Sequence, residues 1–104
     1  MPIALSAAHY AAAKAAILGL TRHLAREVAA DGVCVNAVAP GTTLSERVKQ
    51  FTTEESAKTL IAITPLGRLA NLEDQVEPIL FLASDGAAYI TGATLDVNGG
   101  RFMM

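Results

Sequence analysis

The spacing of hydrophobic residues along the chain predicts a long helix at its start. From residue 7 to residue 30 alanine dominates and no proline interrupts the pattern. Apolar side chains recur there every three or four residues, at Ile17, Leu20, Leu24 and Val28. A second apolar stripe, at Ala11, Leu18 and Ala25, predicts a helix that is buried on two sides. Asp31-Gly32 then ends the helix, with glycine as its C-terminal cap.

Two short apolar runs predict buried strands. Residues 33–39 read Val-Cys-Val-Asn-Ala-Val-Ala and stop at Pro40-Gly41. Residues 93–97 form the second run, which ends at Asn98-Gly99-Gly100. The polar, turn-rich stretch between the two strands contains the signals of three further helices.

Capping patterns predict where these three helices begin. Thr43 with Glu46, and Thr52 with Glu55, fit the capping box and predict helices over residues 44–51 and 54–61. A third helix, opened by Asn71 and Asp74, runs to about residue 84 with Pro78 in its interior. In the loop before it, Arg68 is expected to pair with an acidic group.

The order of elements predicts an α/β fold with a parallel sheet. Two strands are too few for a complete domain of this class, so further strands are expected upstream. The chain has 104 residues, 52% of them hydrophobic. Such a high apolar content indicates faces that need partners outside the chain, since a domain this small buries only about two-thirds of its unfolded surface.

Composition excludes several classes of function. A net charge of −2 with scattered Lys and Arg argues against a nucleic-acid surface. No apolar run is long enough to span a bilayer. Cys34, the only cysteine, indicates a reduced cytoplasmic setting and is expected to be a small buried core residue. His9 and His23 lack neighbours at metal-ligand spacing, so no metal site is predicted.

Tyr10 and Lys14 are candidates for proton transfer. They stand four residues apart on the first helix and therefore share a face. A free tyrosine has a pKa near 10, which a nearby ammonium group lowers toward the range of a useful acid. Taken alone, the spacing favours the alternative of a solvated lysine beside an ordinary aromatic ring.

Pro40-Gly41 marks a second candidate position. Ligands of open parallel sheets bind beyond the carboxyl ends of the strands, where this dipeptide is expected. Glycine lets the backbone approach a ligand closely, and proline restricts the turn. The alternative is a simple turn from strand to loop.

Five segments together resemble the classical short-chain dehydrogenase/reductase family. They are Tyr-Ala-Ala-Ala-Lys at 10–14, Val-Asn-Ala-Val-Ala-Pro-Gly at 35–41, Pro-Leu-Gly-Arg at 65–68, Phe-Leu-Ala-Ser-Asp at 81–85 and Ile-Thr-Gly-Ala-Thr-Leu-Asp-Val-Asn-Gly-Gly at 90–100. They follow the family's order and spacing over essentially the whole chain. They are most similar to members of the 3-oxoacyl-[acyl-carrier-protein] reductase type.

The resemblance implies an NAD- or NADP-dependent oxidoreductase that interconverts a carbonyl and an alcohol by hydride transfer. Tyr10 would be the acid/base for the substrate oxygen. Lys14 would hydrogen-bond the nicotinamide ribose and lower the pKa of Tyr10. The substrate would be a small carbonyl or alcohol compound, and the enzyme would assemble as a homo-oligomer, a dimer or a tetramer.

The resemblance also implies where the cofactor is held. The backbone around Pro40, Gly41 and Thr43 would contact the nicotinamide carboxamide. Ser45 falls where the family often has a threonine that contacts the cofactor diphosphate. Residues of about 42–65 would form the mobile lid over the substrate.

The chain departs from the family by what it lacks. It contains neither the Gly-x-x-x-Gly-x-Gly turn that holds a pyrophosphate nor the Asn-Asn-Ala-Gly motif. Residues 1–104 are therefore expected to be the C-terminal part of a Rossmann-type domain, with its catalytic helix at 7–30 and its last helix and strand within 71–100. Such a piece is expected to be inactive alone. The alternative is a non-catalytic association module that self-assembles or pairs with a missing N-terminal half.

Overall fold

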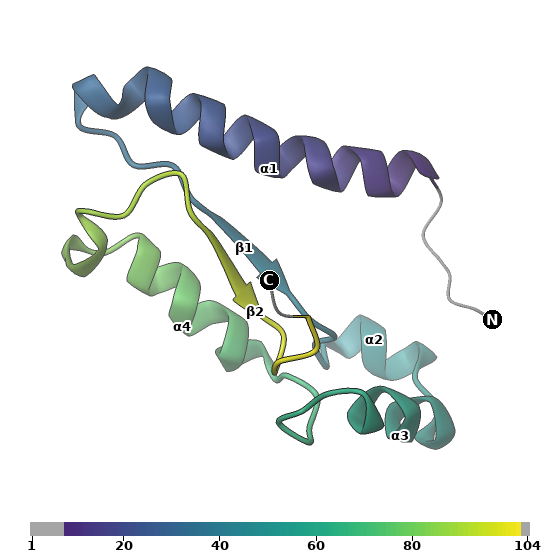
Figure 1. Cartoon of the computed structure of the whole chain (residues 1–104). Helices are drawn as coiled ribbons and strands as arrows, with labels where there is room; N and C mark the ends of the chain where they lie inside the picture. Colours follow the sequence, from purple (N-terminus) through teal and green to yellow (C-terminus); the bar gives the residue numbers. More distant parts are fainter. Residues whose placement is uncertain (1–7, 103–104) are drawn as a thin grey trace. The chain divides into compact units, whose positions relative to one another are not determined.

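The computed structural model describes residues 8–102, which divide into two compact units. Of the described residues, the first unit contains 8–37 and 88–94, and the second contains 38–87 and 95–102. Figure 1 shows the elements of both units along the chain. Each unit is described by itself.

The first unit is built on helix α1, Ala8–Val28, which continues into a 3₁₀ turn at Ala29–Asp31. Gly32 closes the turn in the left-handed conformation, with φ of 75°, and donates its N–H to the carbonyl of Ala29. The predicted helix and its glycine cap are confirmed.

Fewer residues of α1 are buried than the sequence predicts. Only Thr21 and Ala25 are buried, whereas the side chains of Ile17 and Leu20 are 49% and 55% exposed. The expectation of burial on two sides is wrong for this structure, since no described element covers the stripe that carries Ile17 and Leu20.

Strands β1, Ala37–Pro40, and β2, Thr94–Val97, form a two-stranded sheet. The Ala37 N–H donates to the carbonyl of Ala93, and the Gly41 N–H donates to that of Val97. From the first bond to the second, the donor and the acceptor each move four residues toward the C-terminus. The strands are therefore parallel, as the arrows in Figure 1 also show. The predicted α/β class with a parallel sheet is confirmed.

Strand β1 begins later than predicted, because residues 33–36 find other hydrogen-bond partners. The Val35 N–H donates to the hydroxyl of Thr91, and the Val35 carbonyl accepts from Gly92. The Asn36 side chain bonds to the backbone of the loop before β2. Cys34 lies in this irregular segment and is exposed, so its predicted burial is wrong.

The second unit contains helices α2 (Glu46–Phe51), α3 (Glu54–Ala62) and α4 (Leu72–Leu82), followed by a 3₁₀ turn at Asp85–Ala87. Two of the predicted caps are wrong by one or two residues. Ser45 rather than Thr43 caps α2, and Thr53 with Ser56 forms the capping box of α3. The predicted cap Thr52 instead donates its hydroxyl to the carbonyl of Val48, at 2.6 Å.

Helix α4 begins where the sequence predicts. Asn71 and Asp74 form its capping box, each side chain accepting from the backbone N–H of the other. Pro78 lies inside the helix without ending it. None of the helices described over residues 8–102 is both long and apolar enough to cross a bilayer.

Candidate functional site

Tyr10 and Lys14 lie together on α1 in the first unit. The Lys14 ammonium lies over the ring of Tyr10, 5.4 Å from its centroid, which is within cation–π range. The Tyr10 side chain is 53% exposed, and its hydroxyl bonds to no other residue within 8–102. Among the described residues, the phenol thus lies exposed with a positive charge beside it.

The second candidate group lies in the second unit, on the residues that follow β1. We call residues 40–45 the β1 exit segment. Its Gly41 N–H donates to Val97 at 2.8 Å, and a parallel bridge joins Thr43 to Ala70. The bridge consists of two bonds, from the Leu44 N–H to the Ala70 carbonyl and from the Ala70 N–H to the Thr42 carbonyl. The exit segment is thus tied to the end of β2 and to the loop before α4.

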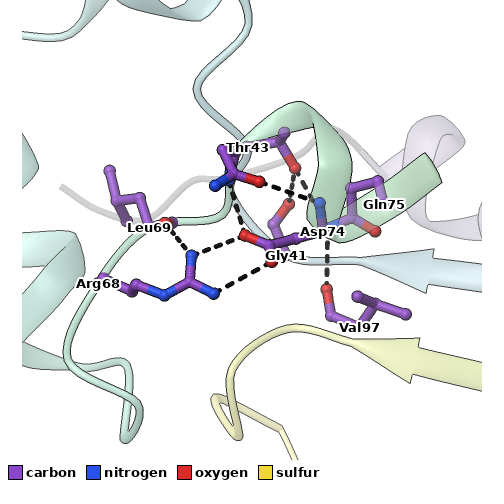
Figure 2. Close-up of polar contacts among 8 residues, drawn as sticks. Gly41, Thr43, Arg68, Leu69, Asp74, Gln75 and Val97 are labelled. Atoms are coloured by element: carbon purple, nitrogen blue, oxygen red, sulfur yellow. Dashed lines mark hydrogen bonds and ion pairs between the residues drawn. The ribbon is translucent and has the colours of Figure 1, made fainter. Parts of the chain in front are cut away.

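A side chain that the sequence analysis did not select, Gln75 of α4, also ties this segment (Figure 2). The Thr43 hydroxyl donates to the Gly41 carbonyl at 3.1 Å and accepts from Gln75 Nε2 at 3.3 Å. Gln75 Nε2 donates also to the Val97 carbonyl at 3.0 Å. In the sequence, the only sign of this contact was an amide side chain spaced three or four residues from apolar residues of α4.

The exit segment has two backbone donors that no described residue uses. Within residues 8–102 the backbone N–H groups of Thr42 and Thr43 have no acceptor, although both residues are half-buried. They can therefore donate to a carboxamide oxygen. Gly41 approaches the backbone of Asn98 so closely that an added Cβ would lie 2.8 Å from Asn98 Cα. This close approach is to Asn98 of the same chain, and the predicted approach of Gly41 to a ligand stays a prediction.

Ser45 belongs to the same group through its backbone. Its N–H donates to the Thr43 carbonyl at 2.9 Å, and its Oγ accepts from the Val48 N–H at 3.2 Å. The hydroxyl hydrogen of Ser45 remains available to an acceptor, since Oγ is engaged only as an acceptor in the described residues. Pro40 is the exposed last residue of β1.

An ion pair braces the loop next to the exit segment. Arg68 forms a two-pronged contact with Asp74, at 2.6 and 3.1 Å, and also donates to the Leu69 carbonyl. The hydrogen bond from Arg68, together with that from the Asn71 N–H, lowers the pKa of Asp74 to about 2. The same pairing raises the pKa of Arg68. The predicted acidic partner of Arg68 is confirmed as Asp74.

A cavity of about 120 Å³ lies beside this brace in the second unit. The residues that line it include Gly41, Thr42, Arg68, Asp74, Asn98 and Arg101. The structure thus brings Tyr10 and Lys14 together in the first unit, and Pro40, Gly41, Thr43 and Ser45 together in the second.

Comparisons with known proteins agree with these observations. A family model described as enoyl-(acyl carrier protein) reductase matches residues 3–101. The 3-oxoacyl-[acyl-carrier-protein] reductase of Pseudomonas aeruginosa is 50% identical over 95 residues, which is 91% of this chain and 38% of that protein. The enzymes of the same name from Escherichia coli and Vibrio cholerae are 46% and 48% identical over 97 residues, 93% of this chain and 39% of each protein.

The chain thus spans about two-fifths of the length of these curated relatives. The family model nevertheless covers nearly every residue described, including both candidate groups. On this match, supported by the α/β fold with its parallel strands, the chain belongs to the short-chain dehydrogenase/reductase family.

Proposed function

We propose that this chain supplies the proton-transfer residues and the nicotinamide-binding segment of an NAD(P)-dependent oxidoreductase that interconverts a carbonyl and an alcohol. The observation that carries the proposal is the exposed phenol of Tyr10 with the Lys14 ammonium 5.4 Å from its ring centroid. This pair stands in a chain whose relatives are named as reductases of a 3-oxoacyl group. A 3-oxoacyl thioester is therefore the first substrate class to test.

In the proposed reaction Tyr10 handles the proton. During reduction its hydroxyl donates a proton to the carbonyl oxygen, and during oxidation the phenolate accepts a proton from the alcohol. The positive charge of Lys14 stabilises the phenolate that remains after donation. Lys14 also binds the ribose of the cofactor. When bound, NAD(P)H supplies the hydride.

The β1 exit segment would hold the nicotinamide end of the cofactor. The N–H groups of Thr42 and Thr43 are the free donors for the carboxamide oxygen, and Pro40 and Gly41 shape the segment that presents them. Ser45 would place its free hydroxyl hydrogen toward a phosphate oxygen. A pyrophosphate also needs a glycine-rich turn, which these 104 residues do not contain. The chain alone is therefore expected to show no oxidation of NAD(P)H.

A hybrid enzyme tests the proposal. This chain replaces the matching portion of the Pseudomonas aeruginosa reductase, and NADPH and NADH oxidation are followed with a 3-oxoacyl thioester. Tyr10→Phe should lower kcat by about 10²–10⁴-fold, as expected for loss of a general acid. Tyr89→Phe is the matched control, because Tyr89 is fully exposed in the same unit. A hybrid that turns over equally well with Tyr10→Phe would overturn the assignment.

A second candidate function, association, is favoured by exposed apolar side chains. On α1 these are Ile17 and Leu20, and on α4 they include Val76, Ile79 and Leu80, all between 46% and 57% exposed. Surfaces of this kind mark protein interfaces. Light scattering on the chain at about 50 μM should show a dimer or larger species, with Leu20→Glu or Leu80→Glu shifting it toward monomer. A well-folded monomer at that concentration argues against this function.

A further inference from the structure

We propose that Gln75 is a positioning residue for the cofactor segment: it orients the Thr43 hydroxyl and thereby the acceptor that meets the carboxamide NH₂ group. This inference rests on the proposed function, since the carboxamide belongs to the nicotinamide cofactor. It adds a residue of α4, thirty-two positions from Thr43, to a segment that is otherwise local to the end of β1.

The hydrogen bonds leave one orientation for the Gln75 amide. Its Nε2 faces two acceptors, Thr43 Oγ1 at 3.3 Å and the Val97 carbonyl at 3.0 Å. A flipped amide would place its oxygen against the Val97 carbonyl oxygen, two acceptors with no proton between them. Nε2 is therefore the atom that joins α4 to both the exit segment and β2 (Figure 2).

This bond also determines what Thr43 can offer to a ligand. A hydroxyl has one hydrogen and two lone pairs. The Thr43 hydrogen goes to the Gly41 carbonyl at 3.1 Å, and one lone pair accepts from Gln75. One lone pair remains, in a direction that the other two bonds determine. It can accept from the NH₂ of a primary carboxamide, while the free N–H groups of Thr42 and Thr43 donate to the carboxamide oxygen.

The other end of the amide is expected to offset part of what the two Nε2 hydrogen bonds add to stability. Its Oε1 is buried and has no donor in the part of the chain that the structure describes. An unsatisfied buried acceptor is costly, and an apolar side chain of the same length would avoid that cost. Replacing Gln75 would leave neither of its partners without a bond. Val97 still accepts from the Gly41 N–H, and Thr43 still donates to the Gly41 carbonyl.

A single variant can therefore test whether Gln75 orients the Thr43 hydroxyl separately from whether it stabilises the fold. Gln75→Met keeps the length of the side chain and removes the bonds to Thr43 and Val97 together with the orphaned Oε1. We expect the urea midpoint of the full 104-residue chain to stay the same or rise. In the same sample, amide hydrogen exchange at Gly41 and Leu44 should accelerate about tenfold, the scale of one lost net hydrogen bond. Glu77→Gln, on an exposed turn of α4, is the matched control and should change neither.

Two results from the full chain would overturn the inference. One is unchanged exchange at Gly41 and Leu44 in Gln75→Met. The other is a lower urea midpoint with exchange accelerated evenly over the whole second unit, which is the behaviour of a residue that only supports the fold. Both readouts are independent of catalysis, so they remain decisive if the hybrid enzyme proves inactive.

The hybrid enzyme supplies the functional arm through a double-mutant cycle. Gln75→Met should raise the KM for the cofactor about five- to tenfold with little change in kcat. It should have no further effect in a Thr43→Val background, because the hydroxyl through which Gln75 acts is gone. Thr43→Ser, which restores a hydroxyl, should restore the effect. If Tyr10→Phe abolishes turnover but Gln75→Met leaves the KM unchanged, the role of Gln75 is refuted while the proposed function stands.

Discussion

Replacing Gly41 with alanine tests the tight junction between the end of β1 and the end of β2. The added methyl group would lie 2.8 Å from Asn98 Cα and 3.0 Å from Asn98 Cβ. Carbon atoms attract best at about 3.5–4.0 Å, so the two backbones would have to separate by roughly half an ångström or more. The Gly41 N–H is bonded to the Val97 carbonyl at 2.8 Å, and separation lengthens that bond. We expect Gly41→Ala to lower the free energy of unfolding by about 1–3 kcal/mol, the usual cost of overpacking.

Urea unfolding followed by circular dichroism measures this change. With a slope of about 1.5–2 kcal/mol per molar urea, the midpoint should fall by roughly 0.5–2 M. Gly19→Ala is the matched control, because Gly19 is in the interior of α1 and its added Cβ would meet no described atom within 4 Å beyond its chain neighbours and the nearby backbone of the helix. That control should gain about 0.5–1 kcal/mol from helix propensity. Gly41→Ala unfolding at or above the wild-type midpoint, with Gly19→Ala stabilised, would refute the reasoning.

Three further substitutions test individual contacts by urea unfolding. Because the pKa of Asp74 is lowered to about 2 from the ordinary 3.8, its carboxylate stabilises the fold above pH 4, and this stabilisation is lost as the pH falls toward 2. Asp74→Asn should therefore lower the urea midpoint at pH 7, and the midpoint of the variant should decrease less than that of the wild type between pH 4 and pH 2. An equal decrease in both proteins would contradict this. Asn36→Ala removes two bonds to the loop before β2 and should cost about 1–3 kcal/mol, whereas a loss near zero would mean that water replaces them. Thr53→Ala removes the α3 cap and should cost about 1 kcal/mol, visible also as lower helicity; equal helicity would count against the cap.

The error in the predicted cap of α2 has a tertiary cause. A capping box is recognised by spacing, and both Thr43 and Ser45 stand within reach of the start of α2. The structure selects Ser45, because Thr43 is held in a bridge with Ala70 and in a hydrogen bond with Gln75. Both partners are distant in sequence, so no local pattern could reveal the competition.

The late start of β1 also depends on residues that are distant in sequence. Residues 33–36 are apolar enough to predict a strand, but the Val35 N–H donates to the hydroxyl of Thr91 instead of to a neighbouring strand. The side-chain amide of Asn36 bonds to the backbone of Ile90 and Ala93 in the loop before β2. Cys34 is consequently exposed rather than buried. The proximity of Tyr10 and Lys14, by contrast, follows from helical spacing alone, and the structure shows it.

The sequence by itself determined the features that depend on near neighbours. These are helix α1 and its glycine cap, the opening of α4 by Asn71 and Asp74, the alternation of helix and strand, and the motifs of the family. Only the tertiary structure decided the features that depend on distant partners: the tether from Gln75 to Thr43 and Val97, and the close approach of Gly41 to Asn98. Helical periodicity and helix caps depend on a few consecutive residues. The orientation of a hydroxyl depends instead on the hydrogen-bond donor that the fold places next to it.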